Sequence, residues 1–225
     1  MDKSSKVKLH LDAMPEQTLE AFKFLSGQGW LKDSGWYLAG GTALALQVGY
    51  RKSVDLDFFT QEKKFDNEKL IKNIDSPDFI TKQSNQDTIY AVLLGASVSF
   101  ISYPFFIPKL PLIKYGSIGV LDARDIAVMK VIALSQRGKK RDFFDLYYCA
   151  NHVLSLEKII TNLKTQYPTV AHNYQHIMKS LNYFEDAEID PDPDLLVDLT
   201  WQTVKNYFER EIPKLTTKLL DLDIK

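Results

Sequence analysis

Two aspartates, Asp55 and Asp57, are separated by one residue in an otherwise apolar segment. In an extended strand, residues i and i+2 point to the same face, so both carboxylates are expected on one side and Val54, Leu56 and Phe58 in the core. Two adjacent carboxylates repel each other and are costly to desolvate unless a cation lies between them. Mg²⁺, or Mn²⁺ in its place, fits this chemistry because it binds carboxylate and phosphate oxygens.

A glycine pair, Gly40 and Gly41, precedes the aspartates and joins a short apolar strand to a short helix. Glycine lets a ligand approach the backbone closely, and the start of a helix offers unpaired N–H groups to a phosphate. Thr42 adds a hydroxyl at the same place. Each feature alone is typical of an ordinary turn or a solvated strand. Together, on a strand–turn–helix–loop–strand pattern, they indicate a site for a nucleoside triphosphate (NTP) and its metal.

A third charged group follows later, where Lys130 and Arg137 precede Asp142 and Asp145. At about 100° per residue, Lys130 falls on the small apolar stripe of its helix, with Arg137 two turns further along. A buried ammonium needs an anionic partner or a path to water. The pattern leaves two accounts open. One is a structural ion pair of Lys130 with Asp142 or Asp145, and the other is a cleft in which Lys130 and Arg137 meet phosphate.

The elements that must position these groups follow from caps, turns and periodicity. In the first half we expect helices over 15–26, over 42–48 with Gly49 after it and from Asp66, and strands over 36–39, 54–59, 79–83, 88–94 and 97–103. From Asp122 the pattern is helical, with one helix to Gly138, another over 142–151, and further starts at Ser155, Pro168 and Asp194. This change predicts an α/β core over 1–120 and a helical lobe over 121–225.

The bulk composition is that of an ordinary globular protein, with 225 residues, 45% hydrophobic and 25% charged. A net charge of −1 excludes a strongly basic nucleic-acid-binding protein, so any contact with a polynucleotide would depend on a local patch. The single cysteine, Cys149, excludes an intramolecular disulfide. No signal peptide and no apolar run long enough to span a bilayer is evident. We therefore expect a cytoplasmic protein with no membrane partner.

The run GGTALALQVGYRKSVDLDFF, over 40–59, resembles the nucleotidyltransferase AbiEii/AbiGii-type toxin family within the DNA polymerase β-like nucleotidyltransferase superfamily. The resemblance implies an α/β fold: a polymerase β-like core with a small mixed sheet, followed by a helical C-terminal lobe, with the cleft between them. It also implies two sets of ligands. The triphosphate would be held by Gly40, Gly41 and Thr42, and the metal by Asp55 and Asp57.

The later run KVIALSQRGKKRDFFDLY resembles the second signature of that family, a Lys, an Arg and Asp-x-x-Asp-Leu-Tyr. The resemblance implies that Lys130 and Asp142 are catalytic, and it favours a ligand contact for Lys130 in a wet cleft. Replacing Lys130 with Met should then leave stability nearly unchanged. We also assign Arg137, together with Arg51 and Ser53 in the polar segment before the aspartates, to nucleotide binding.

One family feature is missing from the sequence. Many polymerase β-like enzymes carry a third carboxylate on a later strand, where it serves the attacking hydroxyl. The matching segment here has serines but no acid, so Asp142 is the candidate substitute. The resemblance implies Mg²⁺-dependent transfer of a nucleotide from an NTP to an RNA, such as the 3′ end of a tRNA, or to a protein. The enzyme would be the toxin of a toxin–antitoxin or phage-defence pair, restrained by a cognate antitoxin.

Two other classes of function stay open, and both are favoured by the missing acid. The chain could be a nucleotide- or RNA-binding relic without transfer, or a structural protein whose acids form a plain ion-pair network. Three minor features are interpreted as structural. His172 and His176 have a spacing that suits Zn²⁺ but lack a third ligand, so a surface pair is favoured. The basic run 139–141 is expected in a solvated loop that could contact an RNA backbone, and Cys149 is expected to be a buried thiol.

Overall fold

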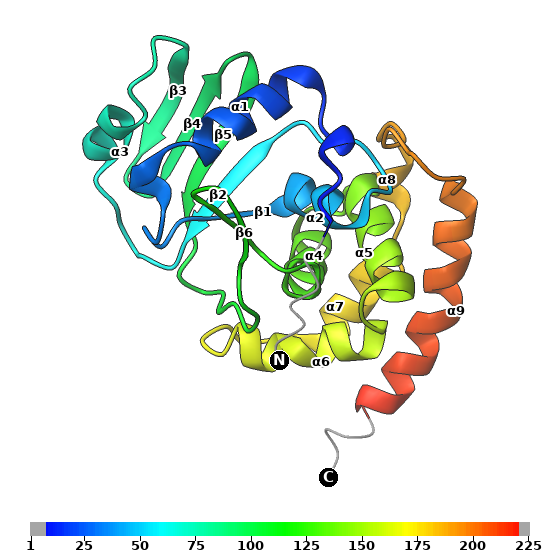
Figure 1. The fold of residues 1–225 in the computed structure, drawn as a ribbon. Coiled ribbons are helices and arrows are strands. Elements are labelled where there is room, and N and C mark those ends of the chain that lie inside the picture. The colour runs from blue at the N-terminus through cyan, green and yellow to red at the C-terminus, as the bar shows by residue number, and fades with distance from the viewer. Residues whose placement is uncertain (1–7, 221–225) are drawn as a thin grey trace, which may run out of the picture. The chain divides into compact units, whose positions relative to one another are not determined.

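The computed structural model describes residues 8–220, and the chain divides after Ala123 into two compact units. The first unit combines a sheet with helices α1 to α3, and the second is built of helices α4 to α9 (Figure 1). The expected α/β fold with a mixed sheet, followed by a helical region, is therefore confirmed.

A mixed seven-stranded sheet forms the first unit, in the order β3-β4-β5-β2-β1-β7-β6. β2 runs parallel to β5 and antiparallel to β1, and β1 runs parallel to β7. Figure 1 shows β3, β4, β5 and β2 side by side. The strand bounds are Tyr37–Ala39 (β1), Leu56–Thr60 (β2), Phe79–Asn85 (β3), Thr88–Leu93 (β4), Ala96–Ser102 (β5), Ile113–Tyr115 (β6) and Ile118–Val120 (β7).

The two faces of the sheet differ because side chains alternate along each strand. Leu56 and Phe58 of β2 and Phe100 of β5 are fully buried on one face. The rings of Phe58 and Phe100 stack with their centroids 5.1 Å apart. Asp57 and Ser99 stand on the opposite face, so the polar groups of the central strands are backed by a packed aromatic layer.

The helices of the first unit are α1 (Glu16–Ser26), α2 (Gly40–Val48) and α3 (Asn67–Asn73), with short 3₁₀ turns over Leu11–Ala13 and Gly29–Leu31. α1 packs against β5 and lies in front of it in Figure 1. Gly49 ends α2 in the left-handed conformation, at φ 63°, as expected. Asp66 caps α3 by accepting a hydrogen bond from the Lys69 N–H. α2 begins at Gly40, earlier than the sequence suggested.

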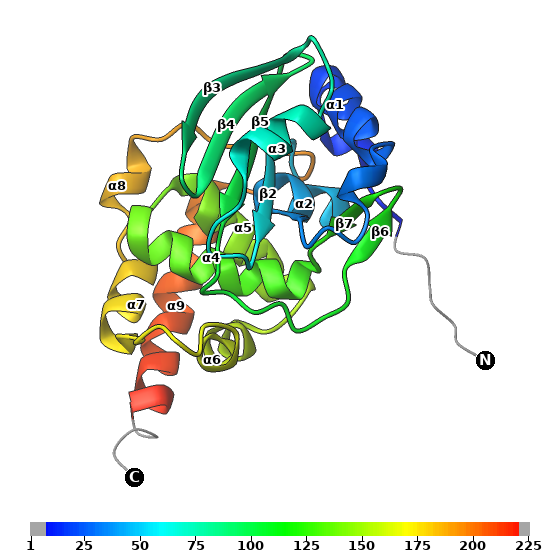
Figure 2. The ribbon, with the colours of Figure 1, turned by 90° about the vertical axis from the view of Figure 1, so that its left-hand side faces the viewer.

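The second unit comprises α4 (Ala123–Arg137), α5 (Lys140–His152), α6 (Leu156–Gln166), α7 (Tyr174–Leu181), α8 (Glu185–Glu188) and α9 (Trp201–Leu220). α5 packs against α6 and α9, and α7 lies beside α9 (Figure 2). Within this unit the Phe143 ring contacts three other aromatic rings, those of Phe184, Trp201 and Phe208. None of the helices in residues 8–220 is long and apolar enough to span a membrane.

Two expected helix starts in this unit are wrong, and the capping groups explain why. Asn173, not Pro168, caps α7, because its side chain accepts a hydrogen bond from the His176 N–H. Thr200 precedes α9, where its hydroxyl accepts a hydrogen bond from the Thr203 N–H, so the helix does not begin near Asp194. The expected start at Ser155 is confirmed.

Candidate active site

Asp57 lies next to the beginning of α2 because of the register of the sheet. It is paired with Ala39 on β1 and with Ser99 on β5, and Ala39 directly precedes Gly40, the first residue of α2. The approach is close: a Cβ at residue 40 would lie 2.9 Å from Asp57 Oδ2, and Gly40 has φ +71°. Only glycine fits at this position, which brings the carboxylate against the end of the helix that attracts anions.

Arg51 packs against the second glycine of the turn. A Cβ at Gly41 would lie 2.6 Å from Arg51 Nη2 and 3.1 Å from Ser53 Oγ. Arg51 is buried, and its guanidinium donates to the Tyr50 hydroxyl at 3.0 Å and to the Lys52 carbonyl at 2.8 Å. The structure therefore brings Gly41, Arg51 and Ser53 together, as the nucleotide-binding prediction requires, although their contact with a nucleotide stays a prediction.

Thr42 connects α2 to the segment that carries the aspartates. Its side chain is fully buried, and its hydroxyl donates to the Asp55 carbonyl at 2.5 Å and is hydrogen bonded to the Ser53 hydroxyl at 2.9 Å. These bonds fix the backbone of Asp55 relative to the start of α2. The contact expected between the Thr42 hydroxyl and a phosphate stays a prediction, because in this structure the hydroxyl is engaged with the protein.

Asp55 and Asp57 are both half-buried at the beginning of β2. β2 starts at Leu56, so Asp55 immediately precedes the strand. The expectation that Val54 is in the core is wrong: its side chain is 53% exposed, because the residue lies before the strand begins. Leu56 and Phe58 are buried as expected, which leaves both carboxylates partly accessible to solvent.

Ser99 is the residue that the sequence did not identify as part of this site. Its hydroxyl donates to Asp57 Oδ1 at 2.6 Å, and its side chain is buried. A hydrogen bond to an ionised carboxylate is among the stronger kinds and orients the group. It holds Oδ1 on the β5 side of Asp57, while Oδ2 faces the start of α2. Ser99 stands on the neighbouring strand, beside Asp57, on the segment where the family resemblance would place a third carboxylate.

The donor set of this site suits Mg²⁺. Among residues 8–220, no group of three or more His, Cys, Asp and Glu side chains is arranged to hold a metal ion. Mg²⁺ is commonly held by one or two carboxylates together with substrate phosphates. Asp55 and Asp57, next to a helix start that accepts phosphate, fit that pattern.

Lys130 forms a buried ion-pair network within the second unit. Its ammonium lies 2.8 Å from Asp142 Oδ1 and 2.5 Å from Asp145 Oδ2, and all three side chains are buried. The wet surroundings expected for Lys130 are therefore wrong, because both acids of α5 reach it across from α4. The structural ion pair that the pattern left open is present. A catalytic role of Lys130 stays a prediction.

Asp142 is held by two cations. Burial alone would raise the pKa of its carboxyl, but the Lys130 ammonium and the Arg137 guanidinium together hold that pKa below its ordinary value. Arg137 donates from Nε to Oδ2 at 2.7 Å and from Nη2 to Oδ1 at 3.0 Å. A fully buried carboxylate with a lowered pKa is a weak proton acceptor, so the geometry does not favour the predicted role of Asp142 as a substitute base.

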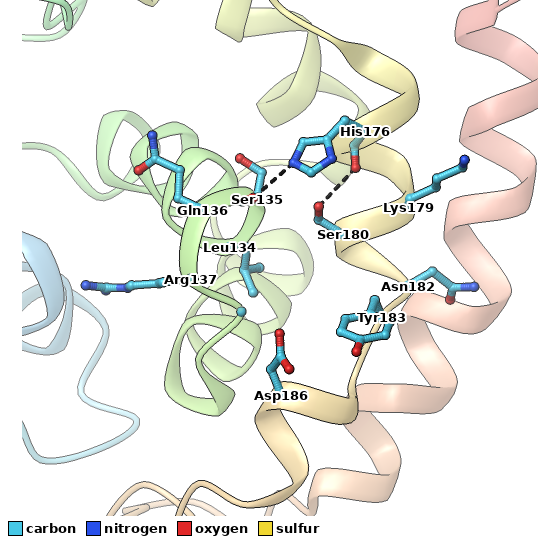
Figure 3. A pocket seen from close by; sticks show the side chains of 11 residues that line it. Leu134, Ser135, Gln136, Arg137, His176, Lys179, Ser180, Asn182, Tyr183 and Asp186 are labelled. Carbon is cyan, nitrogen blue, oxygen red and sulfur yellow. Dashed lines mark hydrogen bonds between the residues drawn. The ribbon is translucent and has the colours of Figure 1, made fainter.

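Arg137 is the exposed member of this network, with 47% of its side chain accessible. Its stem lines a pocket of about 630 Å³ at the end of α4, where side chains of α7 and α8 complete the wall. Figure 3 shows that the guanidinium extends away from His176, Tyr183 and Asp186 on the far wall. No sequence motif marks this pocket, because its walls come from three separate helices.

The minor features are structural. α7 begins at Tyr174, so His172 and His176 do not share one helix, and their Nε2 atoms lie 3.1 Å from the backbone carbonyls of Tyr167 and Ser135. The expectation of a solvated basic loop over 139–141 is wrong in part. Lys140 is buried against Asp192, and Lys139 pairs with Asp190. Cys149 is buried as expected.

The fold is that of the nucleotidyltransferases. It is similar to a candidate nucleotidyltransferase from Helicobacter pylori, with a TM-score of 0.52 at 20% identity over 92% of this chain and 98% of that one. It is also similar to MenT4, a nucleotidyltransferase toxin from Mycobacterium tuberculosis, with a TM-score of 0.50 at 14% identity over 90% and 86% of the two chains. These likenesses establish the fold.

Sequence comparison identifies the family. The profile described as "Nucleotidyl transferase AbiEii toxin, Type IV TA system" matches residues 31–80 and 98–221. The chain is also 36% identical over 182 residues to the uncharacterized protein aq_aa25 of Aquifex aeolicus, which covers 79% of this chain and 86% of that protein. The chain belongs to the AbiEii nucleotidyltransferase toxin family, and it is an enzyme of the nucleotidyltransferase class. The resemblance noted in the sequence is thereby confirmed.

Proposed function

We propose that this chain is a Mg²⁺-dependent transferase that moves a nucleoside monophosphate from an NTP to the end of an RNA, including the 3′ end of a tRNA. The observation that supports this most directly is the placement of Asp57 against the start of α2, with Gly40 in between. A triphosphate bound at the helix start would have its α-phosphate close to both carboxylates. The split of the chain after Ala123 is compatible with a catalytic core over 1–120 and a helical lobe over 121–225.

In the proposed reaction the acceptor hydroxyl attacks the α-phosphorus in line with the bond to the β-phosphate. The new oxygen–phosphorus bond forms, pyrophosphate leaves, and the hydroxyl proton passes to water. Mg²⁺ held by Asp55 and Asp57 would offset the charge that develops on the phosphoryl oxygens. Gly40 and Gly41 would donate backbone N–H groups to the phosphates, with Arg51 and Ser53 beside them. Arg137, which is exposed and oriented by Asp142, stays a candidate for contact with phosphate.

The test is incubation of the protein with each α-³²P-labelled NTP, Mg²⁺ and either total bacterial RNA or a protein extract. We expect label in RNA, dependent on divalent metal and lost in Asp57→Asn. Label in protein would show that the acceptor is a protein side chain. This would contradict the RNA acceptor but not the transfer of a nucleotide. Absence of label from both polymers would contradict the proposal.

A second candidate is a nucleotide- or RNA-binding protein without transfer. It is favoured by the serine at position 99, on the strand beside Asp57, where many related enzymes carry a third acid. Binding of an NTP with Mg²⁺, seen as a rise in melting temperature, without any labelling of RNA or protein would support this alternative.

The family also supports a role as a toxin, for which we propose a cognate antitoxin protein as partner and phage defence as context. Expression in bacteria should slow growth, and Asp55→Ala should relieve the effect. Equal slowing by both proteins would indicate a burden of overexpression rather than toxicity.

A further inference from the structure

A row of side chains crosses the face of the sheet that carries Asp57. The register pairs Asp57 with Ser99 on β5, Ser99 with Tyr90 on β4, and Tyr90 with Gln83 on β3. Residues paired across neighbouring strands project from the same face, so these four side chains form one line. Figure 1 shows the four strands side by side in that order.

Tyr90 is unusual in this row because it is a large ring that is 47% exposed. In the part of the chain that the structure describes, its ring stacks on no other aromatic ring, and its hydroxyl has no hydrogen-bond partner. Ile80, paired with Val92 in the next row of the same face, is 52% exposed. Proteins that bind single-stranded nucleic acids stack bases on exposed aromatic rings of this kind.

The position of Tyr90 relative to Asp57 indicates which base would stack there. Ala39 and the start of α2, where the triphosphate is proposed to bind, lie on the β1 side of Asp57. Tyr90 lies on the opposite side, beyond Ser99. In an in-line displacement, the attacking group enters opposite to the leaving pyrophosphate. The β4 side is therefore the side of the acceptor.

The spacing of the strands and the charge of their side chains both suit a nucleic acid that lies across β4 and β5. Neighbouring strands are about 4.8 Å apart, so β4 lies about 10 Å from β2, which is within the dimensions of a nucleic-acid end that reaches from β4 towards Asp57. β3, β4 and β5 contain no acidic residue, and β3 contributes Lys82. A polyanion can thus lie along these strands without repulsion from their side chains.

We propose that Tyr90 is the stacking platform for the terminal base of a nucleic-acid acceptor, with its 3′-hydroxyl directed past Ser99 towards Asp57. The proposal rests on the proposed transferase function and assigns its acceptor side. It also separates a nucleic-acid acceptor from a protein acceptor, because a protein side chain has no base to stack.

The test compares wild type with Tyr90→Ala, Tyr90→Phe and a matched control, Tyr183→Ala, whose ring is also 47% exposed but lies in the second unit. Initial rates of label transfer from an α-³²P NTP are measured against the concentration of total bacterial RNA, and separately against NTP. Tyr90→Ala should raise KM for RNA by about 5-fold to 150-fold, the range of stacking losses on alanine substitution. KM for NTP should not change, and Tyr90→Phe and Tyr183→Ala should behave as wild type.

An unchanged KM for RNA in Tyr90→Ala would overturn the proposal, and so would a rise in KM for NTP alone, which would assign the ring to the incoming nucleotide. Failure of the proposed function looks different, because wild type itself would label no RNA. In that case the stacking role of Tyr90 is tested by the affinity of the protein for a short single-stranded RNA with a 5′-fluorescein label. Weaker binding by Tyr90→Ala than by Tyr90→Phe supports the platform, and equal binding rejects it.

Discussion

The two aspartate pairs of this chain have the same residue type and close spacing but opposite surroundings. Asp55 and Asp57 are half-buried beside a helix start, partly open to solvent. Asp142 and Asp145 are fully buried and share the ammonium of Lys130. The second pair has its neutralising cation built into the protein, whereas an exchangeable cation can reach the first. We therefore infer that accessibility, more than residue type, decides which of the two pairs is able to bind a metal.

The largest effect is expected from a substitution in the first pair, Asp55 and Asp57. Asp57→Asn should lower the transfer rate by about 10³-fold, because Asp57 is proposed to hold the metal, which would supply several kcal/mol of transition-state stabilisation. The melting temperature should stay near wild type, since removing one charge relieves repulsion with Asp55. The measurement is label transfer together with a thermal melt. Asp87→Asn, at an exposed aspartate in the β3–β4 turn, is the matched control and should retain activity.

The next largest effect is expected when the second pair, Asp142 and Asp145, loses the cation that it shares. Lys130→Met should cost about 3–5 kcal/mol of stability, because it removes the ammonium that two buried carboxylates share, and this reverses the expectation from sequence. Urea unfolding measures the loss. Lys164→Met, at an exposed lysine of α6, should be nearly neutral. A neutral Lys130→Met that abolished the NTP-induced rise in melting temperature would instead assign Lys130 to the ligand.

A smaller effect sharpens the role of Ser99. Ser99→Ala removes the donor to Asp57 Oδ1 and should lower kcat by about 10-fold, the value of one hydrogen bond to a charged group. Because Ser99 is proposed to orient the carboxylate, the KM for Mg²⁺ should rise as well. Ser97→Ala, at an exposed serine on the same strand, should change neither quantity. Loss of stability alone, with kcat unchanged, would make the bond structural.

The last effect concerns pH. The pKa of Asp142 is lower in the folded chain than its ordinary value of 3.8, so its ionised form stabilises the fold. This contribution is complete above that ordinary value and is lost as the pH falls through it towards the folded pKa. The difference in unfolding free energy between wild type and Asp142→Asn should therefore shrink as the pH is lowered below about 4. A difference that does not depend on pH would contradict the lowered pKa.

Much of the fold was predictable because its signals are local. The α4 and α5 helices, the glycine that ends α2 and the cap at Asp66 follow from periodicity and side chains within a few residues. The pairing of β2 with β5 was not predictable, because the two strands are far apart in the sequence and either could pair elsewhere. That pairing is what places Ser99 beside Asp57.

The sequence predicted the residue types of the site, but it did not predict which side chains contact each other. Helical periodicity correctly placed Lys130 on an apolar stripe, yet it could not show that both acids of α5 would reach its ammonium. Similarly, the spacing of Asp55 and Asp57 indicated one face, but the point at which β2 begins depends on hydrogen bonds to β1 and β5. For this reason Val54 was assigned to the core although it is exposed.

The close approach of Gly40 to Asp57 has a consequence for how this enzyme can lose activity. Every amino acid except glycine carries a Cβ, so every missense change of codon 40 places an atom against Asp57 Oδ2 and forces a side chain into a backbone conformation with φ +71°. None of these changes removes a charged group or alters the aromatic layer behind the sheet. In cells selected to escape the toxin, codon 40 should therefore be a target at which any missense substitution yields full-length but inactive protein.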